Sequence, residues 1–182
     1  MPTSKKHRSG PPFRARLKQI KLLLTDVDGV LTDGGLYISE RGETKRFFVQ
    51  DGLAQRLWQM AGLKIGWISA RPSSATKCRA TELKTDFVIQ TKDGKVPAAE
   101  RILKQTGCTW EETCFIGDDV VDLALLRKVG LACAPANSRP EAIKAARYVT
   151  KTQGGNGAFR EVVEMILKAQ GKWRKLVEEV AR

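Results

Sequence analysis

Short apolar runs alternate with segments of helical periodicity along most of the chain, and this alternation restricts the fold more than any other feature. Strands are expected over 20–25, 63–69, 87–90, 113–116, 131–134 and 148–150, and helices over 53–60, 73–83, 96–105, 122–129, 140–146 and 159–169. Strands separated by helices of about ten residues predict crossover connections and therefore a parallel sheet with helices on both faces. We expect an α/β protein with a Rossmann-like sheet.

The segment between the first strand and the first helix predicts a small flap. Residues 36–38 and 46–49, joined by the polar residues 40–43, are typical of a β-hairpin. Only about 15 residues are available there, too few for a cap domain. We expect a basic arm over 1–19, one domain over 20–170 and a charged tail over 171–182.

Composition excludes several classes of protein. The single histidine, His7, lies in the arm, so a catalytic triad or a histidine zinc site in the folded body is excluded. The four cysteines form no C-x-x-C pair, and we expect reduced, mostly buried thiols. No apolar run is long enough to cross a membrane and no secretory signal is visible, so we expect a cytoplasmic protein.

Charge is concentrated near the start of the chain. The net charge is +12, and seven lysine and arginine residues precede the first acidic residue, Asp26. Such an arm could attract nucleic acid or an anionic membrane without specificity, but a solvated extension is the simpler interpretation. We therefore expect no specific nucleic-acid partner and no membrane partner.

Acidic residues cluster directly after two of the expected strands. Asp26 and Asp28 follow the first strand, and Asp118, Asp119 and Asp122 follow the run at 113–116. In a parallel sheet the ligand site lies beyond the carboxyl ends of the strands, and clustered carboxylates there favour a hard divalent cation such as Mg²⁺. Turn and helix-capping chemistry alone is an equal alternative for Asp119, and also for Asp33.

Four short motifs, taken in order, carry a resemblance to a known family. They are D-V-D-G-V-L-T-D from Asp26, the strand-ending Ser69, then Lys95, and G-D-D-V-V-D from Gly117. This set resembles the haloacid dehalogenase superfamily over roughly residues 20–150. With F-x-V-Q-D-G at 47–52, Y-V-T at 148–150 and G-G-N-G-A-F-R-E-V at 154–162, the chain is similar to the 3-deoxy-D-manno-octulosonate (KDO) 8-phosphate phosphatases.

The resemblance implies a role for each motif residue. Asp26 would be the nucleophile that forms an aspartyl-phosphate, and Asp28 the general acid and base. Ser69 and Lys95 would bind the transferred phosphoryl group. Mg²⁺ would be held by the Asp26 carboxylate, the Asp28 main-chain carbonyl and Asp118. Asp119 and Asp122 would contact those ligands rather than the ion and hold them in place.

Substrate contacts are also carried over from the family. The expected set is Asp28, Gln50, Asp51, Gly52, Arg56, Arg71, Arg79 and Lys95. Arg56 and Arg79 could equally be ordinary exposed helix residues. The family has arginine where this chain has Gln50, a departure that removes one anion partner and leaves the sugar acid open.

The family also implies a partner. Capless members are homotetramers in which a neighbouring subunit covers the active site, and residues 154–157 with Arg160 would contribute near such a site. A simple turn before the last helix is a comparable alternative for 154–157.

The leading hypothesis is a Mg²⁺-dependent phosphatase acting on KDO 8-phosphate, in the pathway to lipopolysaccharide. A nine-carbon ulosonic acid 9-phosphate or another small phosphate is the close alternative. A phospho-accepting signalling domain and a nucleic-acid-binding module are remote ones.

Overall fold

The computed structural model describes residues 12–40 and 42–182, so His7, most of the arm and Arg41 lie outside the described residues. A six-stranded parallel sheet runs through the centre in the order β5-β4-β1-β6-β7-β8. Its strands are β1 (Leu22–Thr25), β4 (Lys64–Ser69), β5 (Phe87–Gln90), β6 (Thr113–Ile116), β7 (Leu131–Ala134) and β8 (Tyr148–Val149). The predicted Rossmann-like α/β architecture is confirmed.

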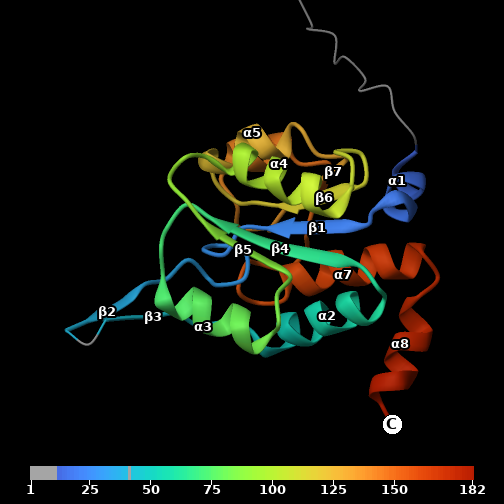
Figure 1. Cartoon of the computed structure of the whole chain (residues 1–182), viewed down its shortest axis with the longest axis horizontal. Helices are drawn as coiled ribbons and strands as arrows, with labels where there is room; N and C mark the ends of the chain where they lie inside the picture. Colours follow the sequence, from blue (N-terminus) through green and yellow to red (C-terminus); the bar gives the residue numbers. More distant parts are fainter. Residues whose placement is uncertain (1–11, 41) are drawn as a thin grey trace, which may run out of the picture.

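Helices cover both faces of the sheet (Figure 1). One face carries α4 (Lys95–Thr106), α5 (Leu123–Leu126), which follows the 3-10 turn η1 (Val120–Asp122), and α6 (Pro140–Ala145). The other carries α2 (Val49–Met60) and α7 (Ala158–Ala169), with α3 (Ser74–Glu82) beside α2. Within the described residues, every helix is too short or too polar to cross a bilayer.

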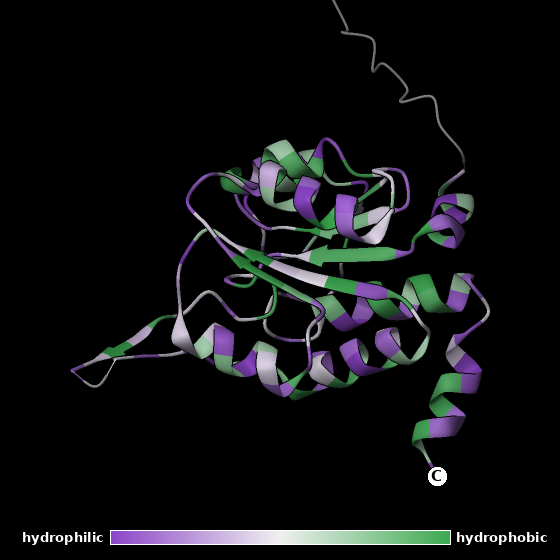
Figure 2. Ribbon diagram, viewed as in Figure 1, coloured by the Kyte–Doolittle hydropathy of each residue, from purple (hydrophilic) through white to green (hydrophobic). Residues whose placement is uncertain are grey.

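Two separate hydrophobic cores follow from this arrangement. On β1, Leu23 packs toward α2 and α7, while Leu22 and Leu24 pack toward α4 and α5. Both faces of the strand are therefore buried, and β1, three leucines followed by Thr25, is coloured mostly hydrophobic in Figure 2. This is why the strands of the sheet appear in the sequence as continuous apolar runs.

The flap is a hairpin, but its second strand differs from the prediction. β2 (Tyr37–Ser39) pairs with β3 (Gly42–Thr44), and residues 46–49 form no part of it. The apolar character of 46–49 has another cause, because Phe47 turns inward and stacks on Trp67 with ring centroids 6.1 Å apart. Val49 begins α2, four residues earlier than predicted.

Both ends of the described chain contain a helix that the sequence analysis left as arm or tail. In α1 (Phe13–Gln19), Leu17 is buried against the α7 core, and Gln170 donates a hydrogen bond to its carbonyl. In α8 (Trp173–Val180), Leu176 is buried against the same core. Only one residue of each helix is fully buried, and the apolar residues of both helices are interrupted by charged ones, so the signal in the sequence was too weak.

The cysteines agree only in part with the prediction. All four are free, as expected. Cys114 and Cys133 are buried on neighbouring strands, whereas Cys78 is exposed on α3 and Cys108 is half-buried.

Candidate active site

The carboxyl ends of three adjacent strands bring the predicted motifs together. β1 lies between β4 and β6, so Asp26 follows a strand flanked by the one that ends in Ser69 and the one that leads to Asp118. Lys95 enters from the first residue of α4. The hairpin projects from this same side of the sheet (Figure 1).

Asp26 is held in one orientation by two contacts. Its Oδ1 accepts a hydrogen bond from the Val27 amide at 2.7 Å, and its Oδ2 lies 2.8 Å from Lys95 Nζ. Lys95 is buried and also contacts Asp122 Oδ1 at 2.5 Å. A buried lysine between two carboxylates is charged and fixed, so the site offers a cation next to a presented carboxylate.

Asp118 and Asp122 differ in how their oxygens are used. Both Asp122 oxygens are occupied, because Oδ1 pairs with Lys95 and Oδ2 accepts from the Asp118 amide at 2.9 Å. Asp118 Oδ1 is buried, yet it accepts no hydrogen bond from any described residue. An orphaned buried carboxylate oxygen calls for a cation.

The geometry of these acids fits a divalent ion. Carboxylate oxygens of Asp26, Asp118 and Asp122 lie within 4.8 Å of one another. Asp122 Oδ2 accepts two main-chain amides and Oδ1 pairs with Lys95, whereas each Asp26 oxygen has one partner and Asp118 Oδ1 has none among the described residues, so Asp26 and Asp118 keep more capacity for an ion. The structure thus brings together three of the acids that the sequence analysis assigns to a Mg²⁺ site.

Burial and like charge shift the pKa values of the site. Burial, with the charge of Asp122 adding to it, raises the pKa of Asp26 to about 6 against the opposing effect of Lys95. Burial and the charges of Asp26 and Asp122 raise the pKa of Asp118 to about 7. Burial lowers the pKa of Lys95, but Asp26 and Asp122 outweigh it and the net shift is upward. Both carboxyl groups therefore take up protons at a higher pH than an ordinary aspartate when no cation lies between them.

These shifts predict pH-dependent stabilisation by Mg²⁺. Both folded-state pKa values lie above the usual aspartate range, so without metal the protein loses stability as pH rises from about 4 to about 7. Protons compete with the ion below about pH 7, and we expect apparent Mg²⁺ affinity to rise with pH, by up to roughly tenfold per pH unit for each proton displaced.

The measurement is the shift of the thermal unfolding midpoint on adding MgCl₂, at about pH 5 and about pH 8, with KCl at matched ionic strength as control. We expect a large shift at the higher pH and almost none at the lower. Equal shifts at the two pH values would show that the ion binds elsewhere, and Asp118→Asn should abolish the shift.

Asp119 and Asp33 have local partners. Asp119 is exposed, caps η1 through the Val120 amide at 2.6 Å, and completes a reciprocal capping box with Asp122. Asp33 is exposed and accepts from the Gly35 amide at 2.9 Å. Helix capping therefore accounts for Asp119 and a local turn for Asp33, and Asp119 is linked to the cluster by its capping box with Asp122.

Ser69 shapes the loop that follows β4. Its buried hydroxyl exchanges hydrogen bonds of 3.1 Å with the main chain of Arg71. The Arg71 side chain is partly exposed and pairs with Glu43 of the hairpin. Arg71, which was predicted to bind an anion of the substrate, is therefore already paired with a carboxylate of its own chain.

Two hairpin residues near the site were missed by sequence reasoning. Lys45 Nζ lies 2.6 and 2.8 Å from the two carboxylate oxygens of Asp28, and Glu43 lies beside Lys45 at 3.5 Å. The available signal was that Glu43 and Lys45 are two residues apart and so share one side of an extended strand. A charged pair on an exposed hairpin does not by itself indicate a partner across the loop.

The remaining substrate residues occupy α2 and α3. Asp51 is buried and accepts a hydrogen bond from the Arg160 amide at 2.9 Å, so its carboxylate serves the start of α7. Burial raises its pKa to about 6. Gly52 lies under the Arg79 guanidinium, where a Cβ would come within 2.5 Å of Nη2. Gln50 and Arg56 are exposed on α2.

The glycine-rich segment 154–157 packs against the loop that follows β1 in the same chain. The Gly155 amide donates to the Val30 carbonyl at 2.9 Å, and the Gly155 carbonyl accepts from Arg46. Arg160 pairs with Glu164 at 2.8 Å and lies over the Trp173 ring. Within one chain, this segment supports the loop after β1 and forms the turn before α7.

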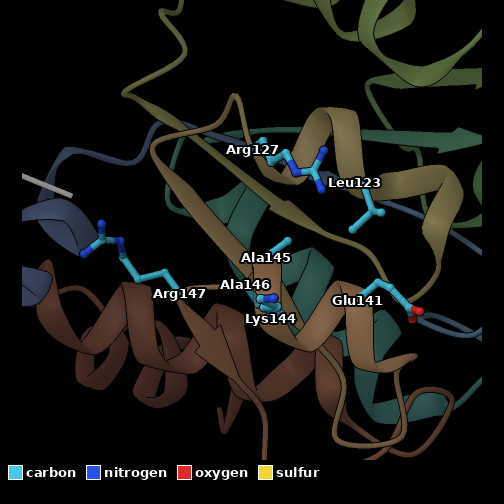
Figure 3. A pocket seen from close by; sticks show the side chains of 7 residues that line it. All are labelled: Leu123, Arg127, Glu141, Lys144, Ala145, Ala146 and Arg147. Atoms are coloured by element: carbon cyan, nitrogen blue, oxygen red, sulfur yellow. The ribbon is translucent and has the colours of Figure 1, made fainter. Parts of the chain in front are cut away.

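An open cavity elsewhere on the molecule is unrelated to these residues. It has a volume of about 510 Å³ and lies by α5 and α6. Its lining is Leu123, Arg127, Glu141, Lys144, Ala145, Ala146 and Arg147. The charged side chains point in different directions (Figure 3), so they form no convergent binding site.

Comparison with known proteins agrees with the geometry. Residues 67–162 match the family of haloacid dehalogenase-like hydrolases. The 3-deoxy-D-manno-octulosonate 8-phosphate phosphatase of Haemophilus influenzae is 40% identical over 161 residues, which are 88% of this chain and 89% of that protein. The chain belongs to the haloacid dehalogenase-like hydrolases. The predicted membership is confirmed, as is the prediction of a phosphoric monoester hydrolase.

Solved structures of this hydrolase family superpose closely on the chain. The KDO 8-phosphate phosphatase of Moraxella catarrhalis, in complex with magnesium ion, phosphate ion and KDO, has a TM-score of 0.88 and 36% identity, covering 92% of this chain and 97% of that one. The cobalt-bound enzyme of H. influenzae has a TM-score of 0.83 and 40% identity, covering 86% of this chain and 92% of that one. Together with the carboxylate cluster, these relatives confirm the prediction of a Mg²⁺-type cofactor.

Proposed function

We propose that this hydrolase converts KDO 8-phosphate to KDO and inorganic phosphate. The observation that carries the proposal is the placement of Asp26 beside Lys95 and close to Asp118, whose buried Oδ1 has no partner in the described part of the chain, at the carboxyl edge of the sheet. The choice of substrate is supported by the M. catarrhalis relative, whose structure contains magnesium, phosphate and KDO.

The proposed reaction uses two carboxylates in two steps. An Asp26 oxygen attacks phosphorus, the bond from phosphorus to the sugar oxygen breaks, and Asp28 gives its proton to that oxygen. Water then attacks the aspartyl-phosphate while Asp28 takes its proton, and the products are inorganic phosphate and free Asp26. With no histidine among the described residues, these carboxylates carry the proton transfers.

Charge neutralisation is divided between the chain and the cation. Lys95 lies beside Asp26 and would face the phosphoryl oxygens, and the Ser69 hydroxyl would donate to another of them. The Asp26 carboxylate, the Asp28 main-chain carbonyl and Asp118 would hold Mg²⁺. When bound, the ion supplies positive charge that allows two anions to approach each other.

A homotetramer would complete the site, as the family resemblance implies. The hairpin beside the site exposes Leu36, Tyr37 and Ile38, the last of them 73% exposed. Apolar side chains on an isolated hairpin are typical of an interface. We propose that neighbouring subunits cover this edge, and that the enzyme works in the cytoplasm on a lipopolysaccharide precursor.

The experiment is a panel of phosphate esters assayed for phosphate release with and without Mg²⁺. We expect kcat/KM for KDO 8-phosphate to exceed that for hexose phosphates by about tenfold or more, and activity to vanish with a chelator. A nine-carbon ulosonic acid 9-phosphate tests the alternative that Gln50 leaves open. A higher kcat/KM for that ester would replace the proposed substrate and keep the mechanism.

A further inference from the structure

Lys45 is a buried cation in a segment that otherwise faces solvent. Its side chain is 0% exposed, whereas both strands of the hairpin that precede it are largely exposed. Figure 1 shows the hairpin reaching away from the body, with its base near the sheet edge. Lysine is almost never fully buried unless paired, so the base of the hairpin must supply partners.

Oxygens from three segments surround the ammonium, which donates hydrogen bonds to Asp28 Oδ2 and Thr76 Oγ1. Asp28 contacts Nζ through Oδ1 at 2.6 Å and Oδ2 at 2.8 Å, Thr76 Oγ1 lies at 3.4 Å and Glu43 Oε1 at 3.5 Å. A lysine has three donors, and here they meet groups from the loop after β1, from α3 and from β3. One nitrogen therefore joins three segments that are distant in sequence.

The contact with Asp28 restricts that side chain in a specific way. A single nitrogen close to both oxygens opposes rotation of the carboxylate, while the side chain remains 25% exposed and open to substrate. The surrounding charges balance, because Arg71 pairs with Glu43 and Lys45 with Asp28. Lys45 is therefore held in place and does not need to leave the pair.

We infer that Lys45 is a positioning residue that aims the Asp28 carboxylate at the leaving oxygen of the substrate. This inference rests on the proposed function, because it assigns Lys45 a task only if Asp28 protonates that oxygen. A displacement of about 1 Å at a reacting group can cost about 100-fold in rate. The hairpin would thereby contribute to proton delivery, in addition to any role as a cover.

The test compares two esters that differ in their need for a proton. The sugar alkoxide of KDO 8-phosphate is a strong base and needs protonation, whereas the nitrophenolate of p-nitrophenyl phosphate leaves without it. The parameter is kcat/KM, which reports steps up to loss of the leaving group. For Lys45→Met we expect a fall of about 100-fold on KDO 8-phosphate and of about threefold or less on the aryl ester.

Two further variants keep the result interpretable. Lys128→Met removes a lysine whose partner Glu100 lies 3.2 Å away on an exposed surface, and it should change neither value. Lys45→Arg keeps the charge but cannot place one nitrogen between both oxygens in the same way. It should show the same selective loss, about tenfold, and it serves if Lys45→Met does not fold.

The outcomes test the role of Lys45 and the proposed function separately. Equal losses on both esters in the folded variants would mean a merely structural Lys45 and would overturn this inference alone. A wild-type chain that releases phosphate from neither ester would overturn the proposed function, and the role of Lys45 with it. A selective loss on the sugar ester supports both.

Discussion

Replacing Asp26 with asparagine is expected to lower kcat on KDO 8-phosphate by about 10⁴-fold or more and to leave a folded protein. The amide cannot form the aspartyl-phosphate, and loss of a nucleophile removes most of the rate enhancement. The contacts with the Val27 amide and Lys95 show that Asp26 is the carboxylate presented at this edge.

The Asp26→Asn variant should lose activity without losing stability. This combination distinguishes the loss of a reacting group from a failure to fold. Burial raises the pKa of Asp26 to about 6, so near pH 8 without metal its ionised form opposes folding, and a neutral amide removes that cost. Thermal unfolding in metal-free buffer should give a midpoint no lower than that of the wild type.

The matched control is Asp86→Asn, which changes a carboxylate that pairs with Lys64 at the opposite end of the sheet. It should keep full phosphatase activity. Turnover by Asp26→Asn within tenfold of the wild type would remove Asp26 from the mechanism.

The site residues that could be predicted from the sequence are those whose positions are set by the strands of the sheet. Asp26, Ser69 and Asp118 each follow or end a buried strand, and parallel strands bring their carboxyl ends to one edge whatever the loops do. Lys95 begins the helix after β5 and reaches Asp26 for the same reason. These positions depend on topology, and topology follows from the apolar runs.

The residues that sequence reasoning missed or misplaced depend on loop conformation. The hairpin turn is shorter than predicted, because β3 begins at Gly42 and ends at Thr44. Lys45 therefore lies at the base of the hairpin, where it contacts Asp28. Asp51, predicted to contact the substrate, also accepts a hydrogen bond from the amide of Arg160, more than 100 residues away in sequence, and no sequence signal indicated this partner. Side chains at the ends of helices have several possible partners, and only the packing of α2 on α7 decides between them.

A second large effect is expected from a single methyl group at Gly154. A Cβ there would lie 1.8 Å from the carbonyl oxygen of Gly29, a main-chain atom that cannot rotate away. Either the glycine-rich segment or the loop that carries Asp28 must shift. We expect Gly154→Ala to lower the free energy of unfolding by about 3 kcal/mol, or about 10 °C in Tm, because overpacking against fixed main chain is among the costliest substitutions.

Gly107→Ala separates loss of space from loss of glycine's flexibility. Gly107 ends α4 at a φ of +70°, and a Cβ there meets nothing within 4 Å, so only the backbone strain of about 1 kcal/mol applies. Chemical denaturation and phosphate release should be measured for both variants. Gly154→Ala should lose kcat even well below its unfolding transition, because the segment supports the loop of Asp28, whereas Gly107→Ala should keep it. Equal losses of stability and unchanged kcat in both variants would show that residues 154–157 do not hold the loop after β1 in place.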